Sequence, residues 1–251
     1  MLIYTPPFQT TYVILLDNPQ LKKKLKIKYG KYLSKTHTFS GKDIDSISCY
    51  SFTNPVLEID RYIFHHTTYD ENILALHGAA VEWNGQAYLF LAATTSGKTT
   101  LASYLTNCGC GYLTDDCILI ERANLLVHPY TTPIQLRDGG LEVLKKYQAA
   151  PNKLELLEEG PSLRRWVYTP ENCIEKAIPL RRIFFIERTE KENCLIDMNT
   201  TERITALMKS PITNYNVTGD YLRLLARIAK IDCHILRYCD MQYVKELIQN
   251  E

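Results

Sequence analysis

The 251-residue chain lacks a long apolar run, and no stretch reaches the roughly 18–20 consecutive apolar residues that cross a bilayer as a helix. Its first ten residues, MLIYTPPFQT, also lack the basic stretch followed by an apolar one that marks a secretory signal. We therefore expect no membrane partner and a cytoplasmic location.

An excess of either charge is missing as well. Lys and Arg number 29 and Asp and Glu number 28, which gives a formal net charge of +1. A protein that binds nucleic acid usually carries a clear positive excess that attracts phosphates. We therefore expect no nucleic-acid partner.

The eight cysteines lack the paired spacing of a zinc site. No C-x-x-C occurs, and Cys108 and Cys110 are separated by one residue, fewer than the common zinc knuckle needs. Cysteines in a reducing compartment usually pack as small apolar side chains. We expect reduced and mostly buried thiols, and a metal or redox role is the alternative.

Residues 1–55 predict a small β-rich N-terminal unit. Strands are expected at 11–16, at 25–29, where LKIKY alternates with period two, and at 46–52. The apolar residues of 56–76 have mixed spacing, and we predict that they form a helix. The lysine-rich segment 21–31 indicates either a solvated strand face and turn, or a basic strand that pairs with an acidic or extended peptide.

From residue 77 onward, short apolar runs alternate with helical patterns, which is typical of an α/β domain. We assign residues 56–251 to this domain. A two-residue turn at Asn84-Gly85 predicts a hairpin that leads into the first buried strand. The expected buried strands span 87–92 and 117–121, and another strand is expected at 182–187. The expected helices span 97–107, 140–149, 200–209 and 219–230. The chain is expected to end with a strand, an Asp240 N-cap and an amphipathic helix.

The segment LAATTSGKTTL, residues 91–101, ends like a phosphate-binding loop. Such a loop joins a buried strand to a helix, so that backbone amides and the helix N-terminus meet the phosphates. Ala92 replaces the usual first glycine, which is tolerated where the backbone needs no positive φ, and Thr95 stands where another glycine is common. Lys98 would reach the β- and γ-phosphates, and Thr99 would hold Mg²⁺. The other residues expected to bind the nucleotide are Thr94, Thr95, Ser96, Gly97 and Thr100. The alternative is a capped helix start with an exposed lysine.

Two adjacent carboxylates, Asp115 and Asp116, precede the strand at 117–121, which we expect to return alongside the strand at 87–92. Such a pair suits a metal anchor and a base that accepts the proton of an attacking hydroxyl. We expect Asp115 to be the base and Asp116 the anchor, and the two roles could be exchanged; Asp-Asp is also common in simple turns. His77, one hairpin before the loop, is either structural or orients the catalytic aspartate.

Three blocks in this order, LHGAAVEWNG, LAATTSGKTTL and GYLTDDCILIE, resemble the HPr kinase/phosphorylase family. They resemble more closely its short relatives in ribosomal-peptide (lasso-peptide type) biosynthesis clusters, and the likeness covers roughly residues 70–248. The resemblance implies a P-loop, phosphoenolpyruvate-carboxykinase-like mixed-sheet kinase core. It also implies ATP- and Mg²⁺-dependent phosphorylation of a hydroxyl on a protein or peptide.

The resemblance implies catalytic roles for Asp115, Asp116 and His77. A positive side chain that stabilises the transferring phosphoryl group is also needed. We favour Arg137, because it lies in the segment HPYTTPIQLR, which resembles the family after the acidic pair. The preferred function is a serine or threonine kinase that acts on a ribosomal precursor peptide, and it is compatible with a homo-oligomer. A small-molecule kinase and a non-catalytic nucleotide- or peptide-binding module are the alternatives.

Overall fold

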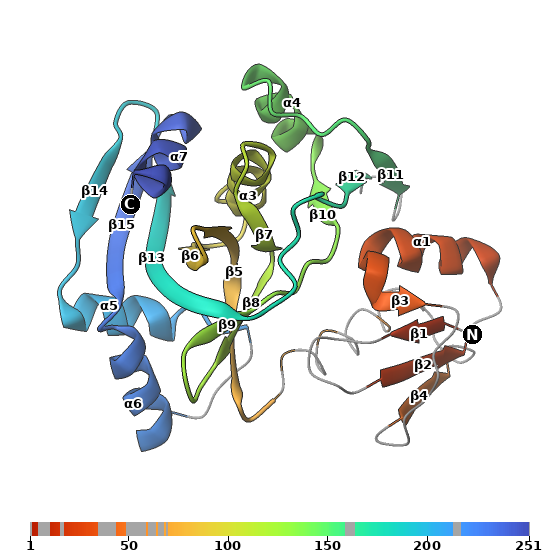
Figure 1. Cartoon of the computed structure of the whole chain (residues 1–251), viewed down its shortest axis with the longest axis horizontal. Coiled ribbons are helices and arrows are strands. Elements are labelled where there is room, and N and C mark those ends of the chain that lie inside the picture. The colour runs from red at the N-terminus through yellow and green to blue at the C-terminus, as the bar shows by residue number, and fades with distance from the viewer. Residues whose placement is uncertain are drawn as a thin grey trace.

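A computed structural model of the chain describes residues 2–4, 11–15, 18–34, 44–48, 59, 64, 68, 70–158, 164–212 and 217–250. Its largest element is a mixed sheet with the strand order β14-β15-β13-β6-β5-β8-β9, and β7 also pairs with β5 (Figure 1). These strands are β5 (Ile73–Trp83), β6 (Gln86–Leu91), β7 (Gly111–Thr114), β8 (Cys117–Glu121), β9 (Leu126–His128), β13 (Ile178–Arg188), β14 (Cys194–Asp197) and β15 (Asp232–Tyr238). The mixed α/β character and the strands predicted at 87–92, 117–121 and 182–187 are confirmed.

The strand β6, which leads into the phosphate-loop segment, lies in the middle of this sheet. It forms an antiparallel hairpin with β5 through Asn84 and Gly85, which have φ values of 51° and 76°. Positive φ at both turn residues is the signature of the predicted two-residue turn. The other neighbour of β6 is β13, which runs parallel to it, so both strands end at the same edge of the sheet.

The prediction that β8 lies alongside β6 is wrong, because β5 lies between them. Residues 80–82 of β5 pair with β7, and residues 73–77 pair with β8. The strands β7 and β8 thus follow successive parts of β5, and the two aspartates lie in the interruption between them. An irregularity of this kind redirects side chains away from the ladder, and it is common next to active sites.

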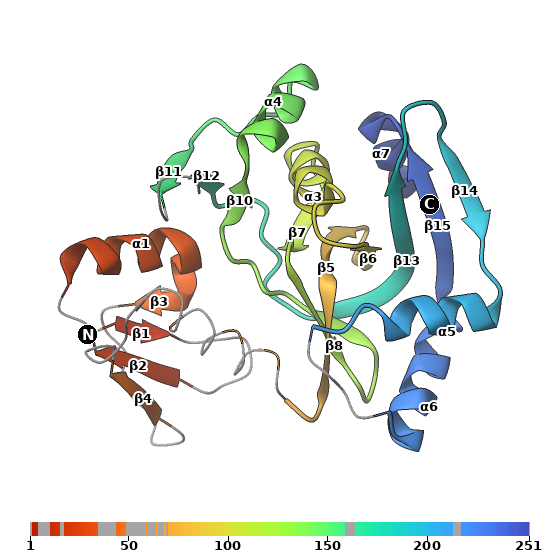
Figure 2. The same ribbon diagram turned by 180° about the vertical axis from the view of Figure 1, so that it is seen from behind.

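Helices cover both faces of the sheet (Figures 1 and 2). The helices α3 (Lys98–Asn107), α4 (Asp138–Lys146) and α7 (Met241–Gln249) contribute to one apolar cluster with β5 and β6, and α5 (Thr200–Met208) and α6 (Gly219–Ile228) contribute to the other. Because both faces are buried, β6 has the continuous apolar sequence that the sequence analysis noted. The helices predicted at 97–107, 140–149, 200–209 and 219–230 are confirmed, as is the C-terminal helix, where the Asp240 side chain accepts a hydrogen bond from the Gln242 amide at the start of α7.

A second sheet, which the sequence did not predict, lies beside α3 and α4 (Figure 1). It contains β10 (Ile134–Leu136), β12 (Arg164–Tyr168) and β11 (Glu155–Glu158), in that order. Where α3 packs against this sheet, the Ser103 hydroxyl of α3 lies 2.5 Å from the Tyr168 hydroxyl of β12. This sheet holds the segment after the acidic pair close to the start of α3.

The described part of the N-terminal unit contains a separate four-stranded sheet with the order β3-β1-β2-β4. Its elements are β1 (Leu2–Tyr4), β2 (Thr11–Leu15), β3 (Leu33–Ser34), β4 (Ile44–Ser48), α1 (Pro19–Tyr29) and a 3-10 turn η1 (Gly30–Tyr32). Strands therefore occur at two of the three predicted places, with residue 16 and residues 49–52 outside the described residues.

The predicted strand at 25–29 is wrong, because these residues form the second half of α1. The Asn18 side chain accepts hydrogen bonds from the amides of Gln20 and Leu21, and Pro19 occupies the first helical position. Leu21, Leu25 and Tyr29 are buried at intervals of four residues, which is the spacing of one helix face. Both interpretations of 21–31 as a strand therefore fail.

The predicted helix at 56–76 is wrong at its end, because β5 begins at Ile73. Most of its earlier part, residues 56–58, 60–63, 65–67 and 69, lies outside the described residues. Among the described residues, no helix is both long enough and apolar enough to cross a membrane. Every cysteine within the described ranges is free.

Candidate functional site

The segment between β6 and α3 joins a buried strand to a helix, which is the arrangement that a phosphate-binding loop requires. Gly97 is the N-cap of α3 with φ 89°, and Thr95 has φ 68° although it carries a β-branched side chain. A branched residue rarely adopts this conformation, which explains why a glycine is common at this position. Ala92 is not among the residues with positive φ, so it can replace the first glycine without strain.

Lys98 is buried within the loop rather than exposed, with a relative exposure of 6%. Its Nζ donates to the carbonyl oxygens of Ala92 and Ala93 at 2.9 and 2.8 Å. Burial lowers the pKa of this ammonium group, and the charge of Asp116 opposes that shift. The alternative of a helix start with an exposed lysine is therefore wrong, because the side chain is buried and donates to loop carbonyls.

The two aspartates differ sharply in their surroundings. Asp115 is 8% exposed, and the Tyr112 hydroxyl donates to its Oδ1 at 2.8 Å. Burial raises the pKa of Asp115 to about 7, with a further contribution from the charge of Asp116, whereas hydrogen bonds from Tyr112 and Thr99 act in the opposite direction. The contact with Thr99 connects Asp115 directly to the phosphate loop.

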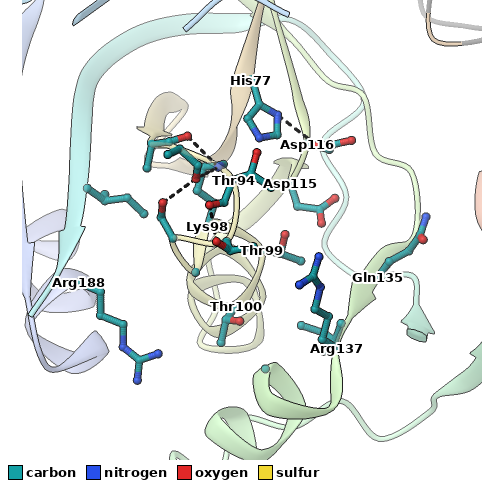
Figure 3. Close-up of a pocket in the computed structure, with 18 of the residues that line it drawn as sticks. His77, Thr94, Lys98, Thr99, Thr100, Asp115, Asp116, Gln135, Arg137 and Arg188 are labelled. Carbon is teal, nitrogen blue, oxygen red and sulfur yellow. Dashed lines mark hydrogen bonds and ion pairs between the residues drawn. The ribbon is translucent and has the colours of Figure 1, made fainter. Parts of the chain in front are cut away.

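Asp116 faces outward, and its side chain is 67% exposed. The Nδ1 atom of His77 lies 3.4 Å from its Oδ1. His77 therefore contacts the second aspartate of the pair (Figure 3). It is held in place by its own amide, which donates to the Ser210 carbonyl at 2.8 Å, while the amide of Gly78 donates to the Asp116 carbonyl.

The loop, both aspartates and His77 line one cavity of about 1210 Å³. Arg137, at the end of β10, and Arg188, at the end of β13, flank the loop on opposite sides (Figure 3). The structure thus brings together every residue that the sequence analysis assigned to the site. These residues are His77, Thr94, Thr95, Ser96, Gly97, Lys98, Thr99, Thr100, Asp115, Asp116 and Arg137.

Sequence reasoning missed Arg188 and Lys28, which also line the cavity. A signal for Arg188 was present, because it ends the apolar strand β13 and parallel strands present their carboxyl ends at one edge of a sheet. Lys28 belongs to α1, which was expected to be a strand, so no sequence signal placed it here. Arg165 also lines the cavity, whereas Arg181 and Arg182 form ion pairs with Asp232.

This arrangement suits a polyanion together with a divalent cation. The N-terminal end of α3 favours an anion through its helix dipole, and Lys98, Arg137 and Arg188 add positive charge around it. Within the described residues, no group of three or more His, Cys, Asp and Glu side chains could hold a metal alone. Mg²⁺ commonly binds through one or two carboxylates plus substrate phosphates, and the aspartate pair fits that need.

Comparison with known proteins gives a structural likeness that is weak. No family model matches the chain, and no curated protein matches it. The chain is similar to the structure of the Hpr(Ser) kinase/phosphatase from Coxiella burnetii, with 10% sequence identity and a TM-score of 0.35. The match covers 70% of this chain and 94% of that chain. Because both the identity and the TM-score are low, this likeness carries no conclusion about function.

Proposed function

We propose that the protein is an ATP- and Mg²⁺-dependent kinase that phosphorylates a serine or threonine hydroxyl of a peptide or protein. One observation carries this proposal: the Lys98 loop at the start of α3 and a pair of aspartates with different surroundings face the same cavity. Phosphoryl transfer needs positioning and charge stabilisation more than covalent help from the protein. The residues that line this cavity could supply both the positioning and the charge stabilisation.

The donor side of the site is the loop and its cationic neighbours. The free amides at the start of α3 would bind the phosphates, with Thr100 closest to the nucleoside end because it lies one position further into the helix. Lys98 would exchange its two carbonyl partners for the β- and γ-phosphate oxygens. Arg137 and Arg188 would neutralise charge on the transferring group from either side.

Thr99 and Asp115 are the residues that would hold Mg²⁺. They are joined by a hydrogen bond, and P-loop enzymes hold the ion between the loop Ser/Thr and an aspartate at the end of a neighbouring strand. Bound there, the ion would supply positive charge to the β- and γ-phosphate oxygens. A nearby cation would also keep Asp115 ionised despite its burial.

Asp116 is the better placed base for the acceptor hydroxyl. It is exposed to the cavity, so an incoming hydroxyl can reach it, and His77 lies against its carboxylate. His77 would orient this carboxylate as a positioning residue. The two aspartates thus take the exchanged roles that the sequence left open, with Asp115 on the metal side and Asp116 on the acceptor side.

The acceptor class rests on the resemblance of the three site blocks to HPr kinases and their relatives in peptide biosynthesis clusters. From this resemblance we propose a ribosomal precursor peptide as substrate, and a cytoplasmic location where ATP is available. A small-molecule kinase on the same core is the competing outcome of the experiment below.

The experiment measures transfer from radiolabelled ATP to an array of serine and threonine peptides, and in parallel the calorimetric affinity for ATP at several Mg²⁺ concentrations. We expect Asp116→Asn to bind MgATP normally and to lose transfer by about 10²–10⁴-fold. Asp115→Asn should instead lose the Mg²⁺ dependence of ATP binding. The proposal fails if the wild-type protein does not bind MgATP, and the assigned roles fail if the two variants show the opposite pattern. Labelling of small hydroxyl compounds without any peptide labelling would favour the small-molecule kinase.

A further inference from the structure

A second cavity, of about 750 Å³, adjoins the cavity that contains the phosphate loop and the aspartates. We name it the side cavity. Its volume lies within the range of about 300–1,000 Å³ that is usual for ligand pockets. Five residues line both cavities, so the two spaces meet at the start of the loop: His77, Ala92, Ala93, Thr94 and Phe185. The other described residues that line the side cavity are Phe64, Ala206, Lys209, Ser210, Pro211 and Ile212.

The side cavity lies where β6 leaves the large sheet. Leu91, the last residue of β6, pairs with Gly78 of β5 on one side and with Phe185 of β13 on the other. Beyond this point the segment after α5 takes the place of β6 beside β5. The amide of His77 donates to the carbonyl of Ser210 at 2.8 Å, and the amide of Ile212 donates to a carbonyl of β5 at 3.2 Å. Phe185 and this segment therefore both border the space that β6 leaves.

The side cavity adjoins the acceptor end of the phosphate loop. Thr100 marks the opposite, nucleoside end: it lies away from His77 and Asp116 (Figure 3), and its Oγ1 would lie 2.9 Å from a Cβ atom at Gly140 of α4. At the acceptor end, Nδ1 of His77 lies 3.4 Å from Oδ1 of Asp116, the proposed base. Because His77 and Thr94 line both cavities, a chain whose hydroxyl meets Asp116 can continue into the side cavity.

The lining of the side cavity combines apolar surface with one permanent positive charge. Phe64 is 38% exposed, and Phe185 and Ile212 are partly exposed. Lys209 is exposed and directly precedes Ser210, whose carbonyl holds the His77 amide. In the described part of the chain, no Asp or Glu lines this cavity. An apolar side chain and a carboxylate would complement such a lining, whereas a polyphosphate would leave the aromatic surface uncovered.

We propose that the side cavity binds the residues next to the acceptor hydroxyl, with an apolar side chain against Phe64 and Phe185 and an acidic side chain paired with Lys209. This inference rests on the proposed kinase function and names the class of its acceptor. Burial of apolar surface favours binding. A flexible peptide also loses conformational entropy when its hydroxyl is held near Asp116, and contacts away from the reacting group offset that loss.

The experiment uses three labelled peptides and measures their binding to the full chain by fluorescence anisotropy, with and without Mg²⁺ and a non-hydrolysable ATP analogue. The peptides are Gly-Asp-Phe-Ser-Gly-Gly, Gly-Asp-Ala-Ser-Gly-Gly and Gly-Lys-Phe-Ser-Gly-Gly. We expect the Asp-Phe peptide to bind about tenfold more tightly than the Asp-Ala peptide, because the latter loses the buried ring. We expect it to bind about three- to fivefold more tightly than the Lys-Phe peptide, as one exposed ion pair would allow.

A charge exchange tests Lys209. Lys209→Glu should reverse the preference, so that the Lys-Phe peptide binds more tightly than the Asp-Phe peptide. Lys209 also ends α5, where a positive charge stabilises the helix dipole, and a role limited to the helix would not reverse a peptide preference. Lys230→Glu is the matched control, because Lys230 is also exposed just after a helix, α6, and lines neither cavity. It should keep the wild-type preference.

An apolar truncation tests the other half of the proposal. Phe64→Ala should reduce the preference for the Asp-Phe over the Asp-Ala peptide by about threefold, because it removes apolar surface from the cavity. Leu222→Ala is its control, since Leu222 is 42% exposed on α6 and lines neither cavity. All four variants should remain folded by circular dichroism and should keep the wild-type Kd for MgATP.

The inference is overturned if the three peptides bind equally, or if Lys209→Glu and Lys230→Glu have the same effect. It is also overturned if light scattering shows a wild-type dimer that Lys209→Glu or Phe64→Ala dissociates, because the side cavity would then hold a second copy of the chain. MgATP binding and serine labelling without the peptide preferences would refute this inference alone. The expected peptide preferences without MgATP binding would refute the kinase proposal and leave the side cavity as a peptide site.

Discussion

Replacing Asp115 by Asn should stabilise the protein at neutral pH in the absence of Mg²⁺. The folded chain holds the pKa of Asp115 at about 7, compared with 3.8 in the unfolded chain, because burial disfavours the carboxylate. Below about pH 3 the group is protonated in both states and contributes nothing. As the pH rises toward 7, only the unfolded chain ionises, so the free energy of unfolding falls. Asn cannot ionise and still accepts the Tyr112 hydrogen bond.

The size of this stabilisation follows from the difference between the folded and unfolded pKa values of Asp115. The difference between about 7 and 3.8 is about 3 pKa units, or about 4 kcal/mol at about 1.4 kcal/mol per unit, which is an upper bound. We expect the Asn variant to be more stable than the wild type by about 2–4 kcal/mol at pH 7.5, and the two proteins to converge near about pH 3. Urea unfolding at several pH values measures the difference.

Addition of Mg²⁺ with a non-hydrolysable ATP analogue extends this test. The wild-type protein should then recover stability, because a cation beside Asp115 favours the carboxylate, whereas the Asn variant should recover much less. A variant that is less stable than the wild type at pH 7.5, or a stability difference that does not change with pH, would refute the reasoning about Asp115. An equal response of both proteins to Mg²⁺ would separately refute its role at the metal.

Two other substitutions test the loop and its support. Lys98→Ala should reduce phosphoryl transfer by about 10²–10³-fold, since it removes a charge aimed at the phosphates, while circular dichroism remains unchanged; near-native turnover would contradict the nucleotide site. Gly78→Ala should lower the free energy of unfolding by about 1–3 kcal/mol in a thermal or urea melt. Its new methyl group would lie 2.6 Å from Cδ1 of Ile118 and 2.8 Å from the Phe90 carbonyl oxygen, and an unchanged melting curve would show that the sheet relaxes freely there.

Local sequence patterns were sufficient for much of the site. The loop, the hairpin and the aspartates are close in sequence, so the order strand, loop and helix brings them together with little help from distant contacts. The positive φ at Thr95 agrees with the position at which a glycine was expected. The burial of Lys98 could not be predicted, because it depends on the path of the loop carbonyls around the side chain.

Patterns failed where two signals competed or where distant segments meet. In α1, the alternation of LKIKY favoured a strand, but the Asn18 cap, Pro19 and the buried faces of Leu21 and Leu25 favour a helix, and the cap was already visible in the sequence. The strands β10, β11 and β12 show no clear alternation of apolar and polar residues. Periodicity therefore predicts neither their sheet nor the position of Arg165 in the cavity lining. The separation of β6 and β8 by β5 likewise depends on long-range pairing.

The pairing of β6 also orders the events of folding. Its hairpin with β5 closes through the two-residue turn at Asn84 and Gly85, which costs little entropy and needs no distant segment. Its pairing with β13 must wait for a strand that lies much later in the chain, and such non-local parallel pairing is slow. His77 and the loop strand would therefore reach their mutual register early, whereas Arg188 would arrive late, so the competence to bind a nucleotide should be among the last properties that a refolding chain acquires.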